Sequence, residues 1–121
     1  MSISVSRHDQ IQGESRGPGV VRKLTVDKST GAGAITSGVV YLEPGGTIRP
    51  HTHLIEEAMT LVEGRLKILV GDQTDEIEAG TSWLAPANTT HGARNIGDGQ
   101  AVLIIAYPAV EVGAFPVDVE F

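Results

Sequence analysis

The sequence predicts an all-β domain, a sandwich or a barrel, on three observations. No stretch carries apolar residues at a sustained helical spacing. Short β-branched or alternating segments instead recur roughly every 8–12 residues, as they do in sandwiches and barrels. The chain has 121 residues, and its 15 glycines supply turns between those segments. A chain of this length is expected to form one domain with a real core.

We expect three parts: an N-terminal arm at residues 1–19, a barrel at 20–108, and a tail at 109–121 that packs on the barrel or on a partner subunit. The arm is polar and ends in the breaker run GESRGPG, so at most one short strand is expected there. Neither end has a place inside a small closed barrel. We therefore expect arm and tail to pair with a second subunit in a homodimer, the commonest closed assembly.

The first strands are expected to be short and β-branched. Residues 20–26, VVRKLTV, and residues 34–42, AITSGVVYL, both fit this description. The turn cluster at 43–46, EPGG, follows. Beyond the next histidines, residues 57–62 alternate in polarity and end at a Glu-Gly turn, which predicts a hairpin.

The second half of the barrel is expected to continue the same pattern. Its strands are predicted at residues 65–70, 74–77, 81–85, 91–95 and 101–107. Glycine-containing turns at 71–73 and 97–99 separate some of them, and Pro86 and Pro108 stop two others. The last predicted strand, AVLIIAY, is apolar throughout and is therefore expected to be buried.

The composition narrows the choice of partners and compartments. Nine basic and 15 acidic residues give a net charge of −6, which argues against nucleic acid or an anionic membrane as a partner. The absence of cysteine excludes disulfides, thiolate ligands and thiol catalysis, and it fits a reducing compartment. The N-terminus has no apolar segment typical of a signal peptide. We therefore expect a cytoplasmic protein.

The most informative stretch is Gly45 to Gly64, GGTIRPHTHLIEEAMTLVEG, which predicts a metal site. On a strand, His51 and His53 project from the same face with Cα atoms roughly 6.5 Å apart, which suits two imidazoles on one ion. Glu57 would lie roughly 13 Å beyond His53 on a straight strand, too far to share that ion. The chain must therefore bend or reverse before Glu57.

A fourth ligand, His91, is expected to arrive from the distant stretch GTSWLAPANTTHGARN at residues 80–95. Three neutral imidazoles and one carboxylate suit a divalent transition ion such as Mn, Fe, Co, Ni or Zn better than Ca or Mg. We expect one such ion on His51, His53, Glu57 and His91, and the sequence leaves its identity open.

These residues resemble the motifs of small single-domain cupins. The first cupin motif, a glycine, His-x-His, a glutamate and a final glycine at fixed gaps, is matched at Gly45, His51, His53, Glu57 and Gly64. The second is matched at Gly80, Pro86, His91 and Asn95, with Asn88 where the family usually has glycine. Asparagine tolerates a left-handed backbone, so the turn should survive. The resemblance implies a double-stranded β-helix, or jelly-roll barrel, with the metal inside.

The resemblance leaves several functions open, because cupins include dioxygenases, decarboxylases, isomerases and non-catalytic binding domains. The first hypothesis is a metal-dependent enzyme on a small oxygenated molecule, with Glu57 as a possible base. The alternative is a non-catalytic module in which the metal stabilises the barrel or binds an effector. A mouth open to the metal and lined by Arg49 or Arg94 would favour chemistry, whereas a sealed metal would favour structure.

Other polar and aromatic candidates are expected to have ordinary roles. Asn95 is expected to hold a strand or loop by hydrogen bonds, and His8 to lie exposed on the arm. Arg49 and Arg94 could bind an anionic substrate but are more often solvated. Core packing is the first expectation for the remaining candidate pocket residues, which are Met59, Leu61, Trp83 and Ile105.

Overall fold

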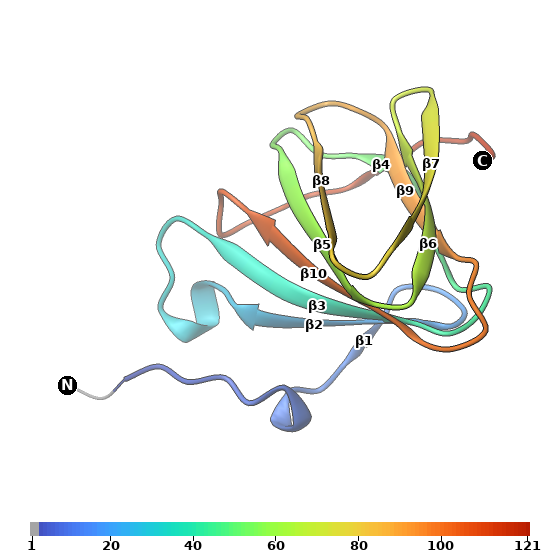
Figure 1. Ribbon diagram of the computed structural model, residues 1–121. Helices are drawn as coiled ribbons and strands as arrows, with labels where there is room; N and C mark the ends of the chain where they lie inside the picture. Colours follow the sequence, from blue (N-terminus) through green and yellow to red (C-terminus); the bar gives the residue numbers. More distant parts are fainter. Residues whose placement is uncertain (1–2) are drawn as a thin grey trace.

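The computed structural model describes residues 3–121, and in this part of the chain it is built almost entirely from strands (Figure 1). The strands are β1 (Glu14–Ser15), β2 (Val20–Val26), β3 (Thr36–Leu42), β4 (Thr47–Thr52), β5 (Glu57–Glu63), β6 (Arg65–Val70), β7 (Gln73–Glu78), β8 (Thr81–Ala85), β9 (His91–Asn95), β10 (Ala101–Tyr107) and β11 (Phe115–Pro116). Two 3₁₀ turns, at His8–Gln10 and Lys28–Thr30, complete the elements. Among the described residues no helix is long and apolar enough to cross a bilayer.

The strands form two antiparallel sheets that face each other and enclose the interior (Figure 1). The six-stranded sheet has the order β1-β2-β3-β10-β5-β8, and the five-stranded sheet has the order β11-β4-β9-β6-β7. Neighbours such as β3 and β10, or β4 and β9, are far apart in the chain, as a jelly roll requires. The predicted all-β fold, a double-stranded β-helix, is confirmed.

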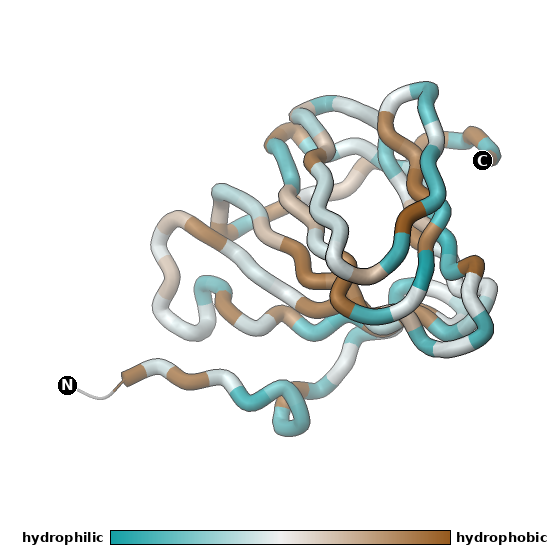
Figure 2. Tube along the Cα trace, viewed as in Figure 1, coloured by the Kyte–Doolittle hydropathy of each residue, from teal (hydrophilic) through white to brown (hydrophobic). Residues whose placement is uncertain are grey.

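The interior of the barrel has an apolar end and a polar end. The apolar end lies around the β5–β6 hairpin, where Leu61 and Leu66 are fully buried beside Leu42 and Ala101. Figure 2 shows a related contrast between strands, with hydrophobic residues along β10 and hydrophilic residues along much of β7. The polar end lies where β5 and β9 begin, and the buried polar residues His53, Glu57 and His91 are found there.

The predicted strands agree closely with the structure. Five of them, at 20–26, 65–70, 81–85, 91–95 and 101–107, have the predicted bounds. The strand predicted at 34–42 begins two residues later, at Thr36, because the 3₁₀ turn and the exposed residues after it precede the sheet.

The turn residues also behave as predicted. Asn88 has a φ of 60°, so it holds the left-handed turn that the cupin motif usually gives to glycine. Gly64 has a φ of 90°, and a Cβ there would lie 2.9 Å from the Cα of Ala101. A side chain at this position would therefore push the β5–β6 hairpin off β10.

The arm and the tail make different contacts. The arm holds one two-residue strand, β1, which pairs with β2, while the described residues before β1, from residue 3 on, lie outside the barrel (Figure 1). The tail folds back onto its own barrel, where Phe115 lies opposite Thr52 and Pro116 opposite His51. The tail strand is thus paired on the barrel of its own chain, which is one of the two places that the sequence analysis expected for the tail.

Candidate metal centre

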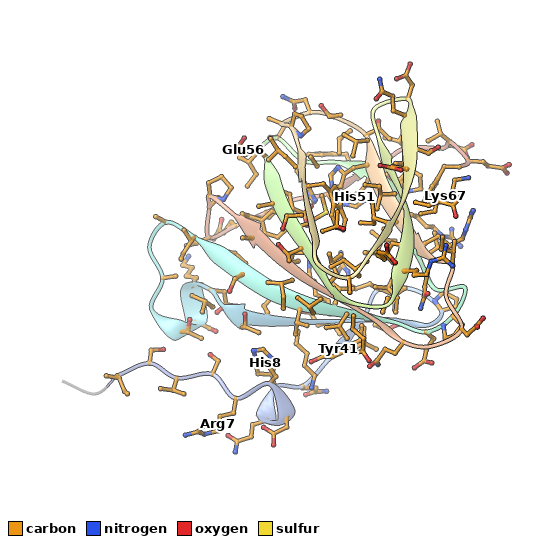
Figure 3. All side chains as sticks on the ribbon, in the orientation of Figure 1. Arg7, His8, Tyr41, His51, Glu56 and Lys67 are labelled. Atoms are coloured by element: carbon orange, nitrogen blue, oxygen red, sulfur yellow. The ribbon has the colours of Figure 1, made fainter. Side chains whose placement is uncertain are left out.

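The four predicted ligands come together at the polar end of the barrel. His51 lies on β4 directly opposite His91, the first residue of β9. Glu57 is the first residue of β5, and His53 lies just past the end of β4. The predicted reversal between His53 and Glu57 is therefore present. Figure 3 shows His51 between the sheets, whereas Glu56 and Lys67 lie on the outside.

The ligand atoms are close enough to bind one ion. One ligand atom from each of the four residues lies within 4.8 Å of all the others, and within residues 3–121 this is the one cluster of its kind. The Nε2 atom of His91 lies 3.0 Å from Glu57 Oε1, and Nε2 of His53 lies 3.4 Å from the same oxygen. The Nε2 atoms of His51 and His53 are 3.1 Å apart.

Backbone carbonyls fix the orientation of all three imidazoles. The Nδ1 atom of His51 lies 2.7 Å from Arg49 O, that of His53 lies 2.7 Å from Gly113 O, and that of His91 lies 3.0 Å from Thr89 O. A carbonyl only accepts a hydrogen bond, so each Nδ1 must carry the proton and donate it. When its ring is neutral, each histidine then turns a bare Nε2 toward the centre, which is how ligating histidines are commonly held.

This donor set fits a divalent transition ion. With both Nδ1 atoms protonated, Nε2 of His51 and Nε2 of His53 face each other as two acceptors, and a cation between them satisfies both. Glu57 contributes a carboxylate oxygen beside them. Three nitrogens and one oxygen match the preferences of Mn, Fe, Ni or Zn. The structure therefore supports a potential metal site at these four residues.

Burial and hydrogen bonds set the protonation of the ligands. Burial is the main reason that the pKa of His51 falls to about 4, so its ring is neutral at physiological pH. Burial acts to raise the pKa of Glu57, but hydrogen bonds with His53 and His91 outweigh it and hold that pKa at about 2. Burial would lower the pKa of His53, yet hydrogen bonds to Glu57 and Gly113 raise it above its ordinary value.

The ligands line a cavity of about 480 Å³, large enough for a small molecule. Its walls include Ile48, Met59 and Ile105, so Met59 and Ile105 serve both the core and the cavity. Glu57 is the one carboxylate among the described residues that line it. All four ligands border this cavity, and His51 is half-buried rather than buried, so the ligand cluster is not sealed inside the core.

Of the two arginines proposed from the sequence, only Arg49 lines this cavity. Arg94 lies on the outer face, where Nη1 donates to Phe121 O at 2.6 Å and the guanidinium lies 5.4 Å from the Phe121 ring centre. Arg16, Arg22 and Tyr107 also line the cavity, and the sequence analysis missed all three. The alternation of β2 gave a signal for Arg22, since it shares a face with Val20.

The tail forms part of the site. Val112, Ala114 and Pro116 line the cavity, and Gly113 O accepts the hydrogen bond from His53. No sequence pattern signals a backbone contact between residues 60 positions apart. The tail therefore positions a ligand directly, a role that the sequence analysis did not assign to it.

The remaining candidates have the ordinary roles expected of them. The Nδ2 atom of Asn95 donates to Leu42 O and Gly99 O, and its Oδ1 accepts from Gly97 N, so Asn95 ties two strands to a turn. Leu61 is buried in the core, and Trp83 packs against it. His8 is exposed on the arm.

Comparisons with known proteins agree with this geometry. A family model described as a cupin domain matches residues 38–107. Polyketide synthase CurC of Streptomyces cyaneus is 29% identical over 96 residues, which is 78% of this chain and 62% of that protein. H2HPP isomerase of Bacillus subtilis is 35% identical over 65 residues, covering 53% of this chain and 28% of the isomerase. The chain thus spans less than two thirds of either relative.

A solved structure extends the likeness to the whole fold. The polyketide cyclase RemF from Streptomyces resistomycificus superposes with a TM-score of 0.80 at 21% identity, covering 94% of this chain and 84% of that one. At this identity the match supports the fold alone.

Proposed function

This chain belongs to the cupin family, and on that premise we propose that it is a metal-dependent enzyme acting on a small oxygenated molecule. The reaction we propose is proton transfer at a carbon next to a carbonyl, as in an isomerase. The observation that carries this proposal is the set of four convergent ligands in the wall of an open cavity. A sealed ligand cluster would instead support a purely structural ion.

The residues suit proton transfer. A divalent ion on these ligands would polarise a substrate carbonyl and make the neighbouring C–H more acidic. Glu57 is the cavity's one carboxylate, and both of its contacts with the histidines use Oε1. We propose that Oε2 takes the proton. One relative is named as an isomerase, which is the reaction class proposed here, and decarboxylation and dioxygen chemistry are less favoured alternatives.

The test is solvent-deuterium exchange. Protein loaded in turn with Mn, Fe, Ni or Zn is incubated with a panel of 2-oxo acids and β-diketones in D₂O, and exchange at the α-carbon is followed by NMR. We expect exchange with at least one metal, and a fall of about 10²-fold or more in Glu57→Gln, the usual contribution of a positioned base. Metal content of the variant is measured in parallel, since Glu57 is also a ligand.

Two results would contradict the proposal. Dioxygen uptake without exchange would assign the site to a dioxygenase. Neither exchange nor uptake, with tight ligand binding, would support the non-catalytic alternative.

We also propose that the chain is a homodimer joined through the arm. Ile3 and Val5 on the arm are 86% and 57% exposed, and Val21 and Val26 on the neighbouring β2 are also exposed. Association with a second copy through the arm would bury these exposed apolar side chains. Sedimentation at micromolar concentration should give a dimer, and removal of residues 1–12 should give a monomer that keeps its metal. A monomeric full chain would overturn this assembly.

A further inference from the structure

We propose that Arg22 binds a carboxylate of the substrate, so that the substrate is an anion with metal-binding oxygens at one end and a carboxylate at the other. This inference rests on the proposed function, because it concerns what occupies the same cavity. The inference extends the proposed function by naming a class of substrate, anions with a distal carboxylate, and by naming Arg22 as the residue that selects this class.

Arg22 occupies an inward position on β2. It lies two residues after Val20, which is 1% exposed and lines the cavity, so the two side chains share the inner face of the strand. On the neighbouring strand Arg22 faces Val40, and Val40 in turn faces Leu103. An arginine thus stands among aliphatic residues in the wall of the cavity, where a Val or Leu would continue the core.

The Arg22 guanidinium is incompletely hydrogen-bonded in this position. Its Nε is the one buried side-chain nitrogen or oxygen without a hydrogen-bond partner in residues 3–121. Its ion pair, from Nη2 to Glu14 Oε2, is 3.4 Å long, beyond the usual range for a hydrogen bond, and the Glu14 side chain is 51% exposed. A largely buried charge is normally paired and fully hydrogen-bonded. The Arg22 guanidinium therefore has the capacity to bind a further anion.

The cavity is positive although the protein is acidic. Arg16, Arg22 and Arg49 line it against one carboxylate, that of Glu57, while the whole chain carries a net charge of −6. Arg22 lines the same cavity as the four ligands and Tyr107, so its guanidinium faces the space that a substrate on the metal would occupy. A planar guanidinium matches a carboxylate with two parallel hydrogen bonds.

The test combines a charge change in the protein with one in the ligand. Arg22→Met removes the charge and keeps the length of the side chain. Arg65→Met is the matched control, because Arg65 forms a comparable surface ion pair with Glu76, at 3.8 Å, outside the cavity. The probes are 2-oxoglutarate and 2-oxoadipate, each compared with its ω-amide, which keeps the chelating end and loses the distal charge. Binding to the Zn²⁺-loaded proteins is measured by calorimetry.

We expect the native protein and Arg65→Met to prefer one of the acids over its amide by at least about 10-fold, the effect of a hydrogen bond between charged groups. Arg22→Met should bind acid and amide equally and retain its Zn²⁺. Its unfolding midpoint should be unchanged or higher, because an incompletely paired charge has been removed.

Three results would overturn the inference. If acid and amide bind the native protein equally, Arg22 does not bind the distal carboxylate, and this result leaves the proposed function unaffected. If Arg22→Met unfolds more easily than Arg65→Met, the pair with Glu14 is structural. If no probe binds the Zn²⁺-loaded native protein, the proposed small-molecule site fails, and the inference fails with it.

Discussion

The two ends of the barrel interior are built from different chemistry. Around the β5–β6 hairpin the interior is aliphatic, and Leu42, Leu61 and Leu66 have no exposed surface. At the other end, the same β5 begins with Glu57 among three histidines. One strand therefore contributes to the core with one end and to the site with the other. We infer from this difference that burial at the apolar end stabilises the fold. The polar end can therefore keep its ligands around a preformed cavity.

The largest effect is expected from damage to the apolar end. Leu61→Ala should lower the free energy of unfolding by about 3–5 kcal/mol, through lost burial and the cavity left behind. Val62→Ala, at a 50% exposed neighbour, is the control and should cost well under about 1 kcal/mol. Urea denaturation measures both. Similar losses in the two variants would mean that the aliphatic end does not carry the stability.

Removing a metal ligand, unlike Leu61→Ala, should leave the fold intact but abolish metal binding. His53→Ala or His91→Ala each removes one of four ligands, so most of the bound metal should disappear. His8→Ala, at the exposed arm histidine, should keep a full complement. Elemental analysis after gel filtration reads the stoichiometry. Full occupancy in both site variants would rule out this ligand set.

The strands and the ligand set could both be predicted from the sequence. Strand positions followed from alternation and turn residues, and the ligand set followed from fixed spacings within His51 to Glu57 and within Gly80 to Asn95. Both patterns involve residues close together in the chain, so they can be recognised without knowledge of the fold. The apolar run at residues 101–107 was predicted as a buried strand for the same reason.

The residues that surround the ligands were much harder to predict. Tyr107 and Arg22 line the site because β10 and β2 fold into one barrel, and Gly113 reaches His53 because the tail returns along β4. Each of these contacts joins segments far apart in the chain. In the sequence Arg22 resembles any charged residue in a strand, because its inward position and its unpaired Nε are set by the fold.

In the metal-free protein, the free energy of unfolding should depend on pH through the titration of the ligands at the polar end. The folded pKa of His51 is about 4 against 6.5 ordinarily, so the unfolded chain binds the proton first and stability falls between pH 6.5 and 4. The folded pKa of Glu57 is about 2 against 4.5, so its stabilising effect holds above pH 4.5 and is lost toward pH 2. His53 acts oppositely, because its raised pKa favours the folded state below 6.5 and that gain disappears at higher pH.

Urea denaturation at each pH measures this balance. Each proton contributes a slope of at most about 1.4 kcal/mol per pH unit, so the effect is smaller than that of Leu61→Ala over a short interval. His51→Gln should flatten the curve between pH 6.5 and 4 and leave the Glu57 region unchanged. An unaltered slope in that variant would show that His51 is not buried as a neutral ring.

The most direct test of the contrast is the stability of the protein without metal. Circular dichroism is recorded during heating of the chelated and the metal-loaded protein. Because the apolar end holds the fold, the chelated protein should keep its β signal and melt cooperatively, with a midpoint lowered by the few kcal/mol that mass action supplies. Loss of the β signal, with no cooperative transition, would mean that the ion holds the barrel together and would contradict the account.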